Sequence, residues 1–382
     1  MTPKEELQAL RGKIDTVSAD MARLFQERQR ISNDIARVKE SGNFAVTDTG
    51  REERVIADAL EISDEDKRAE TASLMRTLIS LSKLRQYDQL GLTGALDFPE
   101  SAVPAQGAVA FQGVPGAWSE HASRTLFPER NYVTREYFED VFEAVKNGEA
   151  AFGVLPIENS ETGAIGEVYD LLRRSSCFIV GQIWINVAQC LIGVPGATVG
   201  DIREVFSHPE GFNQCKRFLK GKNWELTKVR NTAVAAELVA SKMDSNAASA
   251  KFAAIGSRRA AEVNGLEVLA ENITDNPKNR TRFIAIAAQP SYDETADTVS
   301  VSFATQHRSG ALSTVLQTFA LAGINLTRIE SRPVSAEAYR FFVDLQANIL
   351  DSGARDAIMQ AAMQCEYFEV LGCYGTSSEN AR

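Results

Sequence analysis

Three polar side chains follow an apolar run in the middle of the chain. Residues 150–155 are apolar, and Glu158, Asn159 and Ser160 come shortly after them. In an open α/β sheet, ligands bind outside the carboxyl ends of the strands, where a carboxylate, an amide and a hydroxyl can contact a small molecule. The same residue types also build surface turns. Taken alone, this stretch favours the turn.

A second chemically capable group is cationic and lies in the first 40 residues. Apolar residues recur there every three or four positions, which predicts one helix of roughly 37 residues, about 55 Å long, ending at Gly42. Arg28 occupies a place in the apolar seam where Leu or Ile should recur, and a buried charge is costly unless it is paired. At ~100° per residue, Lys39 returns to within about 20° of Arg28, whereas Arg11 is turned roughly 100° away. We expect Arg28 and Lys39 to share a face and Arg11 to serve a neighbouring subunit, although pairing with nearby carboxylates would also explain Arg11 and Lys39.

Composition excludes several classes of function. The chain has 382 residues, 44% of them apolar, and a net charge of −10, which argues against general binding to nucleic acids or to anionic membranes. Its five cysteines form no C-x-x-C pair and suggest reduced thiols in the cytoplasm. The first residues lack the apolar core of a signal peptide, residues 177–194 are too polar to span a bilayer, and three histidines leave little material for a metal site.

The helices and strands that must position these residues are expected to form three domains. Residues 1–92 predict a helical bundle that dimerises, with further helices near 49–60 and 64–90, and residues 93–105 have the Gly and Pro content of a linker. Residues 106–290 alternate strands and helices, which indicates an α/β domain with a largely parallel sheet. Helix starts after Gly116 and Ser257 could offer N–H groups to carboxylates. Residues 296–376 follow the ferredoxin-like order βαββαβ.

The N-terminal pattern resembles the pocket of the all-helical chorismate mutase family. The resemblance implies that the cations hold the two carboxylates of chorismate, while Lys39 and Gln86 hydrogen-bond the ether oxygen as negative charge builds on it. The step needs positioning and electrostatics and no covalent catalysis. The residues that carry this resemblance are Arg11, Arg28, Lys39, Asp48, Arg51, Glu52, Ser82 and Gln86.

Four ordered motifs in the α/β region resemble prephenate dehydratase. They are G-V-P-G-A-W-S at 113–119, P-I-E-N-S at 156–160, S-H-P-E-G-F-N-Q-C at 207–215 and N-R-T-R-F at 279–283. The resemblance implies two α/β lobes around a cleft, similar to periplasmic binding proteins, with Thr281 as the central catalytic residue. It also places five side chains around prephenate, namely Glu158, Asn159, Ser207, Gln214 and Arg282. Ser160 and His208, which lie in the same motifs, are further candidate substrate-binding residues.

The proton for the departing hydroxyl is the open question of that site. A threonine hydroxyl is a weak acid, so Thr281 would orient or relay a proton more readily than supply it alone. Glu158, His208 and water are all candidate donors. His208 could equally cap a turn before Pro209, and Arg282 could equally face outward from a strand.

Two short segments stand out in the C-terminal module, namely Gly310, Ala311 and Leu312, and Glu330, Ser331, Arg332 and Pro333. They resemble the ACT regulatory domain, and the resemblance implies that phenylalanine binds between paired domains.

The whole chain thus resembles the bifunctional chorismate mutase–prephenate dehydratase family. We expect a cytoplasmic enzyme that needs no metal or organic cofactor, converts chorismate to prephenate and then to phenylpyruvate, and is inhibited by phenylalanine. We expect a homodimer, with a tetramer as the alternative assembly. The alternative of another class is a regulatory protein that keeps these folds and binds ligands without catalysis.

Overall fold

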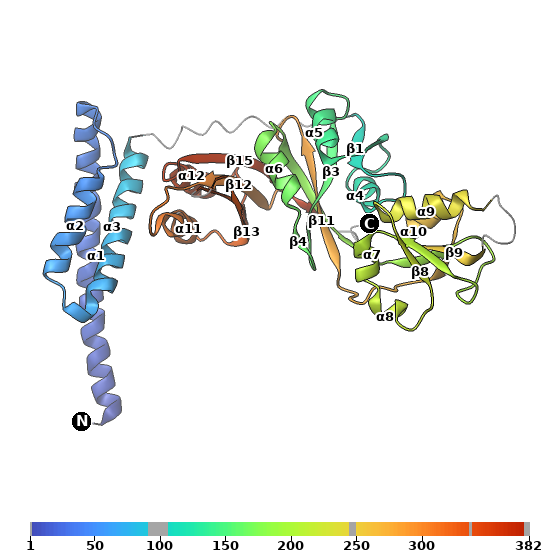
Figure 1. Ribbon diagram of the computed structural model, residues 1–382. Helices are drawn as coiled ribbons and strands as arrows, with labels where there is room; N and C mark the ends of the chain where they lie inside the picture. Colours follow the sequence, from blue (N-terminus) through green and yellow to red (C-terminus); the bar gives the residue numbers. More distant parts are fainter. Residues whose placement is uncertain (1, 91–105, 244–249, 336–337, 378–382) are drawn as a thin grey trace. The chain divides into compact units, whose positions relative to one another are not determined.

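The computed structural model describes residues 2–90, 106–243, 250–335 and 338–377 (Figure 1). The chain forms two compact units. One comprises Met1–Phe98, Thr305–Gly323 and Ser352–Tyr367, and the other comprises Pro99–Ala304, Ile324–Asp351 and Phe368–Arg382. The expected linker at 93–105 lies outside the described residues.

The long N-terminal helix is confirmed as α1 (Pro3–Gly42). Thr2 and Glu5 begin it with reciprocal side-chain to backbone hydrogen bonds, and Asn43 ends it in the left-handed conformation. The two further helices of the predicted bundle are α2 (Thr49–Glu61) and α3 (Arg68–Gln89), and α3 packs against both α1 and α2. The same unit contains α11 (Ala311–Leu321) and α12 (Ser352–Ala362).

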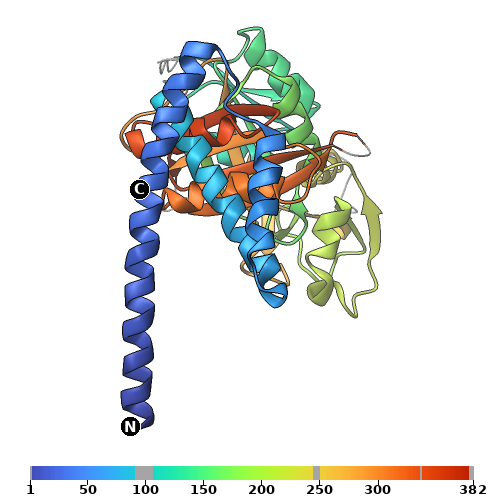
Figure 2. The ribbon, with the colours of Figure 1, turned by 90° about the vertical axis from the view of Figure 1, so that its left-hand side faces the viewer.

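The apolar seam of α1 is exposed along most of its length. The N-terminal half of α1 extends past the ends of α2 and α3 (Figure 2). Leu10 is 51% exposed, Ile14 66% and Leu24 63%, and the seam residues in the C-terminal half of α1 are also exposed. A row of large aliphatic side chains in water is unfavourable, because each would gain about 1.5–3 kcal/mol on full burial. This helix therefore presents a face that a further protein surface could cover.

The first lobe of the second unit is a seven-stranded sheet with the order β16-β5-β11-β3-β1-β2, in which β4 pairs with β3. Its strands are β1 (Val109–Gln112), β2 (Tyr132–Arg135), β3 (Phe152–Asn159), β4 (Gly163–Ala164), β5 (Phe178–Asn186), β11 (Arg280–Ala287) and β16 (Thr376–Ser377). Helix α4 (Trp118–Leu126) packs in the core on one face, whereas α5 (Phe138–Lys146) and α6 (Gly166–Arg174) share the core on the other.

The second lobe is a five-stranded sheet with the order β10-β6-β9-β7-β8. Its strands are β6 (Cys190–Gly193), β7 (Glu204–Ser207), β8 (Glu225–Lys228), β9 (Phe252–Gly256) and β10 (Glu267–Ala270), and its helices include α7 (Pro209–Asn213), α9 (Thr232–Ser241) and α10 (Arg258–Val263). Both lobes mix parallel and antiparallel pairs, so the expectation of a largely parallel sheet is wrong. The reason is that the chain passes from the first lobe to the second after β5 and returns after β10. The first strand after each crossing, β6 or β11, runs antiparallel to its neighbours in the sheet.

The third sheet has the order β13-β14-β12-β15 and contains β12 (Thr298–Ala304), β13 (Leu326–Pro333), β14 (Tyr339–Leu345) and β15 (Tyr367–Tyr374). With α11 and α12 between these strands along the chain, the predicted order βαββαβ is confirmed. We call these four strands the sensor sheet. Phe342, Leu371 and Tyr374 of the sensor sheet belong to the same buried cluster as Leu155 and Ile284 of the first lobe. The sensor sheet and the first lobe therefore share a core.

All five cysteines are free thiols, and burial raises the pKa of each of the Cys177, Cys190, Cys215, Cys365 and Cys373 side chains. In the described parts of the chain, no helix combines the length and the apolar character needed to cross a bilayer.

Candidate active sites

The structure brings two of the three predicted cations of α1, Arg28 and Lys39, to one pocket in the helical bundle. Arg28 Nη1 donates hydrogen bonds to the Leu78 carbonyl (2.5 Å) and to Ser82 Oγ on α3. Lys39 Nζ donates to the Val46 carbonyl at 2.6 Å. These bonds hold Arg28 against α3 and Lys39 against the loop before α2. The two cations thus share one face of α1, as their spacing in the sequence predicts.

Except for Arg11, the remaining members of the predicted helical pocket lie around the same cavity of about 300 Å³. Asp48 begins α2 by accepting a hydrogen bond from the Arg51 N–H (2.9 Å), so one side chain both caps the helix and lines the cavity. Ser82 and Gln86 come from α3 and are buried. The charged and polar residues that line it are Arg28, Ser32, Lys39, Asp48, Arg51, Glu52, Ser82, Lys83 and Gln86.

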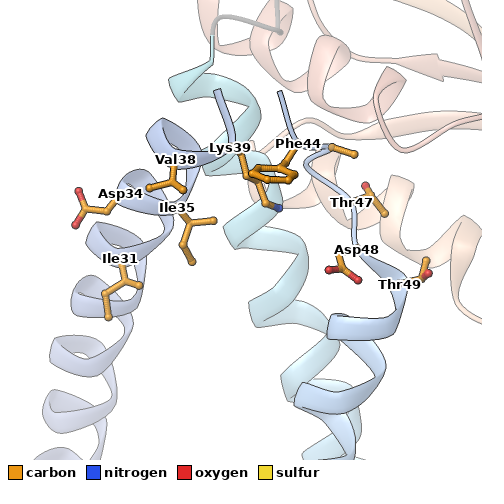
Figure 3. A pocket seen from close by; sticks show the side chains of 10 residues that line it. Ile31, Asp34, Ile35, Val38, Lys39, Phe44, Thr47, Asp48 and Thr49 are labelled. Carbon is orange, nitrogen blue, oxygen red and sulfur yellow. The ribbon is translucent and has the colours of Figure 1, made fainter. Parts of the chain in front are cut away.

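Charge is the notable property of this cavity. Four cations and two carboxylates line it, which leaves an excess of two positive charges. Burial lowers the pKa of Lys39, and Lys83 lowers it further, while Asp48 and Glu52 raise it. The cavity adjoins a more open hollow of about 760 Å³ between α1 and the start of α2, in which Lys39 lies beside Phe44 and Asp48 faces the space (Figure 3). The site therefore suits a small dianion that enters from solvent.

Arg11 is not part of this cavity. It lies on the exposed N-terminal half of α1, 17 positions before Arg28, which corresponds to about 25 Å of helix. A single chain therefore leaves its own Arg11 far from its own pocket.

The second candidate site is built by the register of two antiparallel strands in the first lobe. Thr281 on β11 pairs with Asn159 on β3, and Asn159 Nδ2 donates to Thr281 Oγ1 at 3.0 Å. Asn159 also donates to Asn279 Oδ1 (2.9 Å), and its own Oδ1 accepts from the N–H groups of Glu161 and Thr162. Both Asn159 and Thr281 are less than 10% exposed. Two residues 122 positions apart are thus held in one fixed arrangement.

Ser160 supports this arrangement from the side. Its Oγ accepts a hydrogen bond from the Arg280 N–H at 3.0 Å, and its own N–H donates to the Arg280 carbonyl. Since β11 begins at Arg280, Thr281 lies within the strand.

Glu158 and Arg282 point to the other face of the same strands. They are paired residues in the β3–β11 register, one step from Asn159 and Thr281, and successive side chains of a strand alternate between faces. Glu158 forms an ion pair with Arg328, and Arg282 forms one with Asp344, both on the sensor sheet. The structure therefore separates these two predicted site residues from Asn159 and Thr281.

Three more predicted site residues lie where β7 passes into α7 in the second lobe. Ser207 is fully buried, and its hydroxyl donates to the Ile255 carbonyl at 3.0 Å. His208 begins α7, with Nδ1 accepting from the Glu210 N–H at 3.2 Å, and burial lowers its pKa. The capping role left open for His208 is therefore present, and it favours the neutral ring.

Gln214 contacts both segments that cross between the lobes, and a loop of the first lobe contacts α10 of the second. Gln214 Oε1 accepts from Gln189 Nε2 (3.1 Å), and the Gln189 N–H donates to Thr274 Oγ1 in the other crossing segment. Ser257 Oγ donates to the Gly116 carbonyl at 2.7 Å while capping its own helix α10. A side chain at Gly116, where φ is +91°, would strike the backbone of α10, so glycine permits this close approach.

The predicted effector residues fall into two groups. Gly310 precedes α11 with a φ of +81°, and Ala311 and Leu312 begin that helix. Glu330, Ser331, Arg332 and Pro333 end β13, where Arg332 pairs with Asp170 at 3.0 Å. These groups belong to different compact units, and their role in effector binding stays a prediction.

Sequence reasoning missed two residues that belong with these sites. Lys83 follows Ser82 on α3, lines the cavity and pairs with Glu52 at 3.0 Å. Its position next to Ser82 gave no indication, because only the structure shows how α3 is rotated. Asn279, 1% exposed, holds Asn159, and its place in the N-R-T-R-F motif could have identified it. In the described residues, no group of three or more His, Cys, Asp or Glu side chains could hold a metal ion.

Comparisons with known proteins match the two regions of the chain that contain these sites. The family model for chorismate mutase type II matches residues 10–87, and the model for prephenate dehydratase matches residues 109–291. A bifunctional chorismate mutase/prephenate dehydratase of Enterobacter agglomerans is 30% identical over 398 aligned positions, which cover 100% of this chain and 98% of the relative.

Two solved structures are similar to about 70% of this chain. A chain described as a novel type of quorum-quenching acylase is 31% identical, with a TM-score of 0.65 over 71% of this chain and 98% of that one. The prephenate dehydratase of Arthrobacter aurescens, in complex with L-Phe, is 28% identical, with a TM-score of 0.63 over 70% of this chain and 89% of that one.

Proposed function

Because the chain belongs to the family of bifunctional chorismate mutase/prephenate dehydratases, we propose that its two candidate sites carry out two successive reactions. The helical cavity rearranges chorismate to prephenate. The site at Asn159 and Thr281 converts prephenate to phenylpyruvate, carbon dioxide and water. The observation that carries the proposal is the hydrogen bond between Asn159 and Thr281, which unites two separate dehydratase motifs in one buried arrangement.

The first reaction is intramolecular, so the cavity acts by orientation and charge. Arg28 and the neighbouring cations bind the two carboxylates of chorismate and hold the compact conformer from which the bonds rearrange. Negative charge then grows on the ether oxygen, and Lys39 and the amide of Gln86 are the donors placed to stabilise it. Lys83 offsets the charge of Glu52, which would otherwise repel a dianion.

The second reaction needs a hydrogen-bond donor at the departing hydroxyl. Asn159 donates into the oxygen of Thr281, so within the described contacts the Thr281 proton is left to donate to substrate. The leaving hydroxide takes up one proton to become water, the carboxylate leaves as carbon dioxide, and its bonding electrons complete the aromatic ring. Thr281 orients this transfer, and the ultimate proton source remains one of Glu158, His208 or water. The ion pair of Glu158 with Arg328 and the capping role of His208 favour water.

Mixing the purified chain with chorismate tests both assignments. We expect prephenate to appear first and phenylpyruvate to follow, with prephenate alone also giving phenylpyruvate. A chain that binds both compounds and forms neither product would instead be the non-catalytic regulatory protein of the alternative hypothesis.

Phenylalanine is the proposed inhibitor. The Arthrobacter aurescens dehydratase was crystallised with L-Phe, and this chain contains a βαββαβ module with the residues of the ACT pattern. Inhibition requires that phenylalanine bind the less active arrangement more tightly. Titrating dehydratase activity with phenylalanine, and with tyrosine and tryptophan as controls, tests both the effect and its selectivity.

A second copy of this chain is the proposed partner of the exposed α1 seam. Pairing two such helices would bury the aliphatic row and bring the Arg11 of one chain to the pocket of the other. Light scattering on the full chain should give twice the monomer mass or, if dimers pair further, four times that mass. Leu10→Asp, at the exposed end of the seam, should shift the dimer toward monomer.

Free thiols in all five cysteines agree with a cytoplasmic location.

A further inference from the structure

Two ion pairs connect the sensor sheet to the strands that carry Asn159 and Thr281. Glu158 and Arg282 directly adjoin these residues on β3 and β11, and they occupy paired positions in the register. Their partners are Arg328 on β13 and Asp344 on β14, which are also paired positions in the sensor sheet. One register pair in the first lobe therefore meets one register pair in the sensor sheet.

The Arg282–Asp344 pair is buried and extended by hydroxyl groups. Arg282 Nη1 lies 2.6 Å from Asp344 Oδ2, and each side chain is 7% exposed. The other oxygen of Asp344 accepts from Ser300 Oγ, which lies 2.6 Å from the Tyr374 hydroxyl. Removing one member of such a pair leaves an uncompensated charge in a dry environment. The pair therefore strongly restricts where Arg282 can lie.

Arg328 restrains the other strand. Its side chain is 12% exposed, pairs with Glu158 and stacks over the Tyr169 ring with 5.4 Å between the guanidinium carbon and the ring centre. Burial lowers the pKa of Arg328, which means that burial alone disfavours its charged form. The nearby carboxylates of Asp344 and Glu330 raise this pKa and so offset the effect of burial. The contact with Glu158 fixes the backbone one residue before Asn159.

We propose that Arg328 and Asp344 are positioning residues for the dehydratase reaction, acting through Glu158 and Arg282 on the alignment of Asn159 with Thr281. The proposal rests on the proposed function of that site. A shift of about 1 Å in a reacting group can cost roughly 100-fold in rate, so a modest change in either ion pair is sufficient. Arg328 lies two residues before the Glu330–Pro333 segment on the same strand, which gives an effector bound there a direct route to the catalytic strands.

The test uses Arg328→Gln and Asp344→Asn in the full chain, with prephenate as substrate and no phenylalanine. We expect each variant to lower kcat about 10- to 100-fold, with KM changed less than about threefold because neither residue belongs to the proposed prephenate contacts. Arg328→Lys keeps the charge and should recover much of the lost rate. Lys146→Gln, which removes an exposed ion pair with Glu143 on α5 of the same lobe, is the matched control and should leave kcat unchanged.

Chorismate mutase activity and the unfolding midpoint of each variant separate positioning from loss of fold. Normal mutase activity, a normal unfolding midpoint and a reduced kcat support the proposal. An unchanged kcat in both variants overturns it, as does a reduced kcat that returns to normal when rates are expressed per folded molecule. If Asp344→Asn does not fold, the Arg328 series decides alone. Failure of wild-type protein to convert prephenate would refute the proposed function instead, so the two failures are distinct.

Discussion

The helical cavity and the Asn159–Thr281 site differ in how completely one chain builds them. In the helical cavity, long charged side chains from three helices surround an open space, and Arg11 lies about 25 Å of helix away from Arg28. At the second site, short polar side chains are buried and hydrogen-bonded by the register of β3 with β11.

This difference follows from the two chemistries. A rearrangement within one dianion requires charge around the whole molecule, and long cationic side chains supply it from several helices or subunits. Loss of a hydroxyl group requires a few donors at fixed positions, and strand register places short side chains more accurately than a helix surface does. We therefore expect the first site to respond to charge and assembly, and the second to respond to small changes in geometry.

The largest expected effect tests the geometric side of this comparison. Thr281→Val keeps the shape of the side chain and removes the hydroxyl, and it should lower dehydratase kcat by about 10³-fold. Thr281→Ser keeps the hydroxyl and should lose much less. Both rates are measured on prephenate, while unchanged mutase activity controls for folding. Equal activity of the valine variant and the wild type would remove Thr281 from the mechanism.

The next largest effect tests the charged site. Arg28→Ala removes the cation that contacts Ser82 and should lower mutase kcat/KM by about 10²- to 10³-fold while sparing prephenate turnover. Arg30→Ala is the control, because Arg30 lies two residues along α1 on its exposed side. Loss of both activities in Arg28→Ala would contradict the separation of the two sites.

A pH profile sharpens the electrostatic account of the helical cavity. The pKa of Lys39 is lowered by burial and by Lys83. Lys39 therefore loses its proton at a lower pH than an ordinary lysine does, and mutase activity should fall at that lower alkaline pH. Lys83→Gln removes the neighbouring positive charge and should move this alkaline fall to higher pH. A fall that does not move would show that Lys83 does not act on Lys39. Dehydratase activity should show no corresponding change.

The smallest expected effect concerns the stability of the second lobe. The pKa of His208 is lowered in the folded chain by burial, so the unfolded chain binds the proton more readily and stability falls as pH drops below the ordinary histidine value near 6.5. His208→Asn can cap α7 without titrating. Between pH 7.5 and 5.5, the unfolding midpoint of this variant should therefore fall less than that of the wild type. An equal fall would assign the acid sensitivity to other groups.

The sequence predicted the elements better than their arrangement. The spacing of apolar residues located α1 closely, because helix periodicity is a local property, and the motifs located Asn159 and Thr281. The directions of the strands depend on crossings between lobes, which have no local pattern, so the mixed sheets were not predicted. Glu158 and Arg282 were assigned to the prephenate pocket by the family resemblance, whereas strand alternation turns them toward Arg328 and Asp344 of the sensor sheet. Lys83 was missed because helix rotation is set by packing.

Mixing the Arg28→Ala and Thr281→Val proteins tests most directly whether one chain contains two separate active sites. With chorismate as substrate, Thr281→Val alone should release prephenate into solution, and Arg28→Ala alone should give little product. The mixture should form phenylpyruvate, because the Arg28→Ala protein can take up the released prephenate. Accumulation of prephenate in the mixture without any phenylpyruvate would contradict the account.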